Sequence, residues 1–108
     1  MSSLSCCDCD EGIAGLPGES VSVIFTDPPY IGETYAEAYR VLARHAGRVL
    51  VPGGYLVSYC PQYYLPEILR IFEGSGLAWF WLVAQVNSGA KAIVWSRHAM
   101  CAYKPIVI

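Results

Sequence analysis

Charged residues are scarce in this sequence. They make up 15% of its 108 residues, against roughly 25% in an average globular protein. Hydrophobic residues, at 55%, supply enough apolar surface to offset the entropy of ordering the chain, which excludes an intrinsically disordered protein. The length allows one domain and no more. So few charges on so small a domain predict that something covers part of its surface.

Long hydrophobic runs and targeting segments are also absent. The longest apolar run, residues 77–84, falls well short of the roughly 20 residues that a membrane span needs. The first twenty residues contain no Lys, no Arg and no apolar core, which excludes a secretory signal peptide. We therefore expect a cytoplasmic protein that does not contact a membrane.

The cysteines follow neither a disulfide pattern nor a metal-ligand pattern. Their number, five, is odd, and no secretory context accompanies them. Cys6, Cys7 and Cys9 are too closely spaced for a zinc knuckle, and no second pair with ligand spacing follows them. His45 and His98 are isolated in the sequence. The sequence therefore predicts no metal site.

Positive charge is missing from the first third of the chain. Residues 1–39 carry seven acidic side chains and no Lys or Arg, whereas residues 40–108 have a net charge of +5. Arg40, Arg44 and Arg48 recur at every fourth position, which places them in one stripe on a helix. Such a stripe is either a solvated helix face or a patch that faces phosphate. A pI near 5.5 argues against a free-standing nucleic-acid-binding protein.

Strand and helix patterns alternate along the chain. A polar, helical turn is expected around residues 10–16, and residues 21–26 form a β-branched run typical of a buried strand. Further strands are predicted at residues 55–60 and 77–86, helices at 32–49 and 65–73, and a last extended segment at about 99–108. The predicted fold class is α/β, with parallel strands joined by helical crossovers. Because no helix joins the final two segments, they should pair in antiparallel fashion.

One tetrapeptide lies where chemistry is expected. Asp27-Pro28-Pro29-Tyr30 follows directly on the first predicted strand, and open α/β sheets bind ligands beyond the carboxyl ends of their strands. Its two prolines are compatible with neither a strand nor a helix. The structural alternative is a rigid turn in which Asp27 only caps a backbone amide.

These four residues suit the alkylation of a conjugated amine. The exocyclic amino group of adenine or cytosine is a poor nucleophile because its lone pair is delocalised into the ring. The carboxylate of Asp27 and the carbonyl of Pro28, each accepting one amino hydrogen, would localise that pair on nitrogen. Pro29 restricts Pro28 to an extended conformation, so the carbonyl has a fixed direction. Tyr30 supplies a flat face on which an extruded base can stack, worth about 1–3 kcal/mol.

A family resemblance rests on this motif. Residues 23–30 resemble the catalytic motif of S-adenosylmethionine-dependent DNA amino-methyltransferases, which modify adenine-N6 or cytosine-N4. Residues 48–54 look like the family's "VLKPGG" turn. Residues 64–69, Trp95 and residues 103–107 are similar to methyltransferase domains that accompany ParB-like nuclease domains in phages and plasmids. The resemblance implies part of a Rossmann-like methyltransferase fold, S-adenosylmethionine as cofactor and DNA with a flipped target base as partner.

The cofactor side of the family pattern is incomplete. Cys7-Asp8-Cys9 looks like the family's "GDC", with a cysteine in place of glycine, and the resemblance implies that Asp8 and Asp27 lie near the cofactor. The family's glycine-rich cofactor loop is absent, and the glycines between residues 12 and 18 do not reproduce it. We therefore expect residues 1–108 to be one partial catalytic domain, truncated or split from a cofactor-binding half that acts in cis or in trans.

Two other functions remain open from the sequence, and a third, cytosine-C5 methylation, does not fit its cysteines. An RNA or protein amide N-methyltransferase usually shows Asn where this chain has Asp27. Cytosine-C5 chemistry needs a nucleophilic Cys after a Pro, whereas Cys60 precedes Pro61. A non-catalytic remnant or interaction module would keep the motif without binding cofactor, which a titration with S-adenosylmethionine tests. The sequence does not decide between adenine and cytosine as the target.

Overall fold

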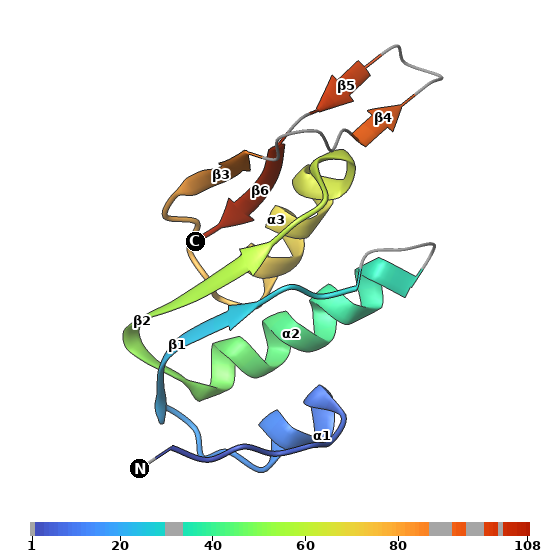
Figure 1. Cartoon of the computed structure of the whole chain (residues 1–108). Coiled ribbons are helices and arrows are strands. Elements are labelled where there is room, and N and C mark those ends of the chain that lie inside the picture. The colour runs from blue at the N-terminus through green and yellow to red at the C-terminus, as the bar shows by residue number, and fades with distance from the viewer. Residues whose placement is uncertain (1, 30–33, 87–91, 95–98, 102) are drawn as a thin grey trace.

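The computed structural model describes residues 2–29, 34–86, 92–94, 99–101 and 103–108. Helices and strands alternate up to residue 86, and the described segments after it are strands. The helices and the short 3-10 turn are α1 (Cys9–Ala14), α2 (Tyr35–Val49), η2 (Gln62–Tyr64) and α3 (Leu65–Gly74). The strands are β1 (Val21–Thr26), β2 (Leu50–Tyr59), β3 (Leu82–Val86), β4 (Ala92–Val94), β5 (Ala99–Cys101) and β6 (Tyr103–Val107). Figure 1 shows the short β4–β5 hairpin projecting away from the larger sheet.

The larger sheet has the strand order β1-β2-β6-β3. β1 and β2 are parallel, with Ile24 opposite Leu56 and Thr26 opposite Ser58, as the helical crossover α2 between them requires. β6 is antiparallel to both β2 and β3. These pairings confirm the predicted α/β class, the parallel pair and the antiparallel pairing of the final segment.

Both C-terminal strand predictions had wrong boundaries. The strand predicted at residues 77–86 begins only at Leu82. Trp81 exchanges two backbone hydrogen bonds with Ile108, and the N–H of Phe80 donates to the same carbonyl of Ile108, so the pairing with β6 does not extend back to residues 77–80. The segment predicted at residues 99–108 splits into β5 and β6, which belong to different sheets. β6 also lies between β2 and β3, so the third strand of the predicted parallel series does not neighbour the second.

The second strand starts earlier than predicted. β2 follows α2 directly and runs through Pro52, Gly53 and Gly54. Gly53 has a φ of +79°, a left-handed conformation that glycine adopts at no steric cost. A Cβ on Gly54 would lie 2.9 Å from the carbonyl oxygen of Ser22 on β1. The two glycines therefore let β2 bend and still approach β1 closely, where the pairing register shifts.

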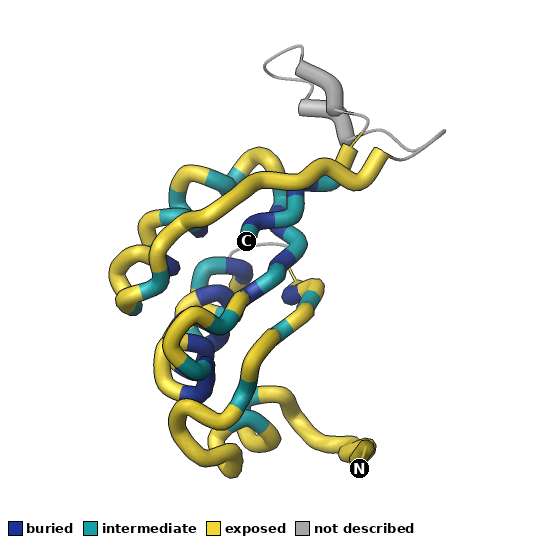
Figure 2. The backbone as a smooth tube through the Cα atoms, turned by 90° about the vertical axis from the view of Figure 1, so that its left-hand side faces the viewer, coloured by how far each residue is buried: buried dark blue, intermediate teal, exposed yellow. Residues whose placement is uncertain are grey.

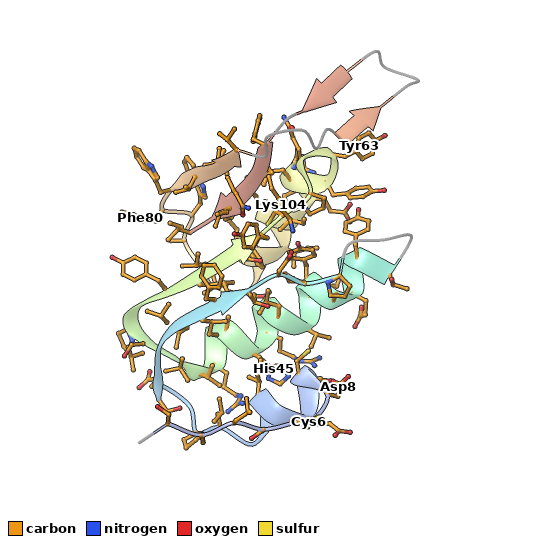
Figure 3. All side chains as sticks on the ribbon, in the orientation of Figure 1. Cys6, Asp8, His45, Tyr63, Phe80 and Lys104 are labelled. Carbon is orange, nitrogen blue, oxygen red and sulfur yellow. The ribbon has the colours of Figure 1, made fainter. Side chains whose placement is uncertain are left out.

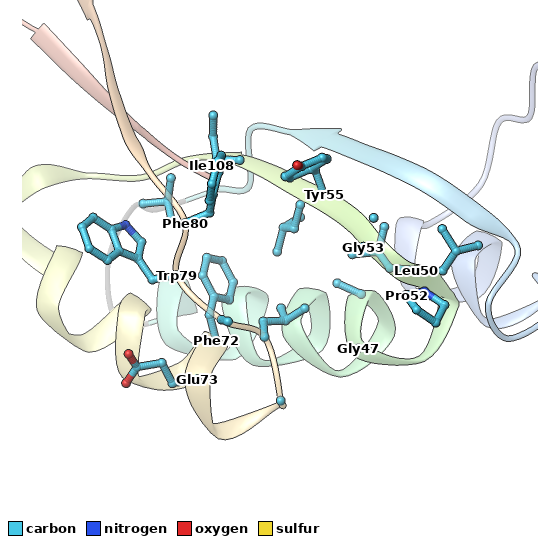
Figure 4. Close-up of a pocket in the computed structure, with 18 of the residues that line it drawn as sticks. Gly47, Leu50, Pro52, Gly53, Tyr55, Phe72, Glu73, Trp79, Phe80 and Ile108 are labelled. Atoms are coloured by element: carbon cyan, nitrogen blue, oxygen red, sulfur yellow. The ribbon is translucent and has the colours of Figure 1, made fainter.

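The hydrophobic core lies on one face of the sheet. Tyr39 of α2 and Ile68 of α3 are fully buried against Leu56, Cys60 and Val107 of the β2 and β6 region. Figure 2 shows the buried segments of α2, β2 and β6 gathered together, and Figure 4 shows both helices below the sheet. Tyr35, Tyr39, Leu42 and Ala46, which share one face at helical spacing, belong to the buried face of α2.

The opposite face of the sheet is apolar but exposed. Val23 and Phe25 on β1 and Tyr55 on β2 are 54%, 67% and 46% exposed. These residues alternate with Ile24 and Leu56, which face the core, as the period of two along a strand dictates. Among the described residues, no helix covers this face. We call Val23, Phe25 and Tyr55 the uncovered face.

The arginine stripe holds α1 against α2. The guanidinium of Arg48 donates to the carbonyls of Leu16 and Ile13, at 2.7 and 2.8 Å. Arg44 and His45 contact the carboxylate of Asp10 on α1. Two of the three arginines therefore serve packing within the fold, which is neither of the two functions open from the sequence.

Candidate functional site

Asp27 lies directly after β1, at the carboxyl end of the parallel strand pair. Its side chain is 50% exposed. Pro28 is buried and Pro29 is exposed, so the backbone after Asp27 is fixed on one side by packing. Tyr30, the predicted base-stacking residue, lies outside the described residues, as does Trp95.

Lys104 of β6 contacts the Asp27 carboxylate. Its ammonium nitrogen is 2.9 and 2.7 Å from the two carboxylate oxygens, distances typical of charge-assisted hydrogen bonds. Within the described residues, the Asp27 carboxylate accepts hydrogen bonds from Lys104 and caps no backbone amide. Asp27 therefore holds a cationic nitrogen across both of its oxygens.

Tyr59 places an aromatic face beside this pair. The ammonium of Lys104 is 4.6 Å from the centroid of the Tyr59 ring, within the range of a cation–π contact. The Tyr59 hydroxyl donates to Oε1 of Gln85 on β3, and Phe25 meets its ring edge-on at 5.9 Å. The Tyr59 carbonyl accepts a 2.6 Å hydrogen bond from the buried Tyr39 of α2. The Tyr59 side chain is thus contacted by Lys104, Gln85 and Phe25, and its backbone is held by Tyr39.

The start of α2 is anchored to α3. The ring of Tyr35 stacks on Tyr64 at 3.9 Å, and its hydroxyl donates to Glu67. The hydrogen bond to Glu67 is the main cause that raises the pKa of Tyr35 to about 12. Tyr35 therefore stays protonated at neutral pH and fixes the helix that follows the Asp27-Pro28-Pro29-Tyr30 segment.

Cys60 is unsuited to nucleophilic chemistry. It is buried in the core, and this burial raises the pKa of its thiol to about 11. Because the thiolate is the nucleophile, the protonated thiol of Cys60 is inert near neutral pH. Within the described residues, no group of three or more His, Cys, Asp or Glu side chains could hold a metal ion.

The two predicted cofactor residues lie in different parts of the fold. Asp8 is the N-cap of α1 and accepts a 2.9 Å hydrogen bond from the N–H of Asp10. Figure 3 shows Asp8 beside α1, whereas Lys104, the partner of Asp27, lies on the sheet beyond α2. Both described glycines with a positive φ, Gly53 and Gly76, lie away from Asp27. The described residues thus offer no glycine cradle for a nucleotide cofactor at Asp27.

A pocket of about 480 Å³ lies elsewhere. It is lined by the first half of β2, the ends of α2 and α3 and the segment before β3 (Figure 4), including Gly53, Tyr55, Phe72, Trp79 and Phe80. Neither Asp27 nor Lys104 contributes to its lining. Trp79, Phe80 and Trp81 are exposed.

Sequence reasoning missed Lys104, Tyr59 and Gln85. Lys104 is 77 residues from Asp27, and it meets Asp27 only because β6 inserts next to β2. Its one signal in the sequence was its place in residues 103–107, a segment with family resemblance. No local pattern marks Tyr59 or Gln85.

Comparison with known proteins supports the fold. No protein-family model and no curated protein sequence matches the chain. Among solved structures, it is similar to TTHA0409 of Thermus thermophilus, provisionally assigned as a DNA modification methylase. The identity is 20%, the match covers 93% of this chain and 50% of that one, and the TM-score is 0.73.

Two further structures extend this likeness. TTHA0409 complexed with S-adenosyl-L-methionine gives a TM-score of 0.68 at 20% identity, over 93% of this chain and 51% of that one. The complex of M1.HpyAVI with the same compound gives 0.61 at 16% identity, over 91% and 46%. The chain therefore spans about half the length of these structures. It is a small α/β domain whose mixed four-stranded sheet matches part of a methyltransferase fold.

Proposed function

We propose that residues 1–108 form the target-base part of an S-adenosylmethionine-dependent DNA methyltransferase. The enzyme would methylate the exocyclic amino group of adenine or cytosine. The observation that carries this proposal is the half-exposed carboxylate of Asp27 at the end of β1, which already holds a nitrogen across both oxygens. The likeness to solved DNA methylases supports it.

Asp27 and Pro28 would activate the amine. The carboxylate of Asp27 accepts one amino hydrogen, and the carbonyl of Pro28 accepts the other. Together they draw the amine nitrogen towards tetrahedral geometry and localise its lone pair. Neither Pro28 nor Pro29 has an N–H group that would compete for these acceptors. Tyr30 would supply the stacking face for a base taken out of the duplex.

The cofactor would be held by another part of the enzyme. S-adenosylmethionine supplies an electrophilic methyl group on a sulfonium, which must lie within roughly 3–3.5 Å of the attacking nitrogen. The described residues do not form that cradle. We propose that a cofactor-binding half, in cis or in trans, completes the enzyme and covers the uncovered face.

The test is methyl transfer to DNA by the chain joined to a cofactor-binding half, with the methylated nucleoside identified by mass spectrometry. Asp27→Ala should abolish transfer with little loss of stability, since its carboxylate acts on the reacting amine and lies half in water. Glu37→Gln, an exposed acidic side chain on α2, is the matched control and should keep full activity. Near-normal turnover by Asp27→Ala, or methyl transfer only to RNA or to protein amides, would sink the proposal.

A further inference from the structure

The nitrogen that contacts the Asp27 carboxylate is the ammonium of Lys104, a residue of the same chain. Lys104 bridges both carboxylate oxygens, at 2.9 and 2.7 Å. An amino group bound for activation requires the same oxygens. In the structure, the acceptor at the proposed amine site is therefore already occupied by a side chain of β6.

We propose that Lys104 is a positioning residue that closes the amine site until a base enters. Its ammonium takes the place of the target amine on Asp27 and moves aside when a base arrives. This inference rests on the proposed function and adds to it a competitor within the chain. It predicts that the affinity for a base amine is set partly by the contact that the amine displaces.

The surroundings of Lys104 suit a group that changes place. Its side chain is 23% exposed, so part of it already contacts solvent, and its four-carbon stem has several rotamers. The next residue, Pro105, is fully buried and its carbonyl accepts from the N–H of Cys60. The backbone is therefore fixed while the side chain can swing away. An ion pair with one half-exposed partner is weak enough to open at modest cost.

Electrostatics favours the release of Lys104 over an arrangement in which Lys104 and the target amine both contact the Asp27 carboxylate. A carboxylate has room for more than one donor, but an ammonium that stayed on Asp27 would weaken it as an acceptor for the amine. The amine nitrogen also gains positive charge as it is alkylated, and two cations on one carboxylate repel each other. Release of Lys104 removes both penalties and leaves the ring of Tyr59 free to meet the incoming base.

The first measurement is the acetylation rate of Lys104 under limiting reagent, followed by peptide mass spectrometry. Lys91, the other lysine of the chain, is the internal reference. Asp27→Asn should raise the rate at Lys104 by roughly two- to fivefold, the range expected for the loss of an exposed ion pair. Adding 2′-deoxyadenosine 5′-monophosphate or 2′-deoxycytidine 5′-monophosphate at tens of millimolar should raise the acetylation rate of Lys104 in the parent chain but not in Asp27→Asn. The N6,N6-dimethyl analogue of the adenylate, which has no amino hydrogen, should leave it unchanged.

The second measurement is nucleotide affinity, followed by NMR chemical shifts. Lys104→Met keeps an unbranched side chain that can pack over Tyr59 but carries no charge. It should bind the responding nucleotide roughly two- to fivefold more tightly than the parent chain, and Lys104→Arg should bind it no more tightly. A nucleotide that binds without changing the acetylation of Lys104, or binds Lys104→Met no better, overturns the closing role alone. Failure of both nucleotides to bind either chain overturns the base site itself and this inference with it.

Discussion

The same substitution, Val to Thr, should destabilise the chain on one face of the sheet and leave its stability nearly unchanged on the other. Val107 on β6 is 3% exposed and belongs to the core beneath α2 and α3, whereas Val23 on β1 belongs to the uncovered face. Threonine has nearly the shape of valine and suits a strand equally well. The difference between the two variants therefore measures the burial of the new hydroxyl.

The expected magnitudes follow from that burial. A hydroxyl placed in the core without a partner costs about 1–3 kcal/mol, and each kcal/mol lowers the Tm of a domain of this size by roughly 4–8 °C. Val107→Thr should show that loss in urea and thermal unfolding. Val23→Thr should stay within about 0.5 kcal/mol of the parent chain.

The uncovered face adds a second readout. Val23→Thr should reduce the binding of a hydrophobic dye and self-association, because it removes apolar surface from a sheet edge. Both variants are measured at several protein concentrations. If Val23→Thr destabilised the chain as much as Val107→Thr, then this face would be covered in solution and the one-sided arrangement of α2 and α3 would be wrong.

Three further outcomes follow from the site and its surroundings. Burial raises the pKa of Cys60 to about 11, so peptide mass spectrometry after alkylation at pH 8 should find Cys60 unmodified while the exposed Cys6 reacts. Because the thiol ionises at lower pH in the unfolded chain, folding stability should fall as the pH rises above 9 towards 11. The hydrogen bond from His45 lowers the pKa of Asp10 below 3.8. The contribution of the ionised Asp10 carboxylate to folding stability is therefore present above that pH and is lost on acidification. Asp10→Asn should flatten the acid limb of a plot of urea midpoint against pH. In an enzyme completed with a cofactor half, Tyr30→Phe should be mild because stacking needs only the ring, whereas Tyr30→Ala should raise the KM for DNA.

The parts of the fold that local patterns control were predictable. The strand before Asp27 is a β-branched run, and the apolar face of α2 follows helical spacing. That run also predicted a buried strand, which was wrong, because one face of β1 is uncovered and leaves Val23 and Phe25 exposed. The parallel sense of β1 and β2 then follows from the helix between them. The Asp27-Pro28-Pro29-Tyr30 segment was recognised as a candidate site because its chemistry is contained in four consecutive residues.

The rest depends on contacts between distant residues. Residues 77–81 have the aromatic and apolar composition of a strand, but the pairing with β6 ends at the contact between Trp81 and Ile108. The contact of Lys104 with Asp27 depends on the insertion of β6 beside β2. No spacing in the sequence encodes that insertion.

The central claim is that this chain carries the base site and not the cofactor site. The most direct test is a ¹H–¹⁵N NMR titration of the 108-residue chain. Parallel samples receive 2′-deoxyadenosine 5′-monophosphate, 2′-deoxycytidine 5′-monophosphate or S-adenosylmethionine. We expect one nucleotide to give saturable shifts around Asp27 that Asp27→Asn abolishes, and S-adenosylmethionine to bind weakly or not at all. Tight binding of S-adenosylmethionine that is lost in Asp8→Ala, with no response to either nucleotide, would show instead that the chain is the cofactor-binding part.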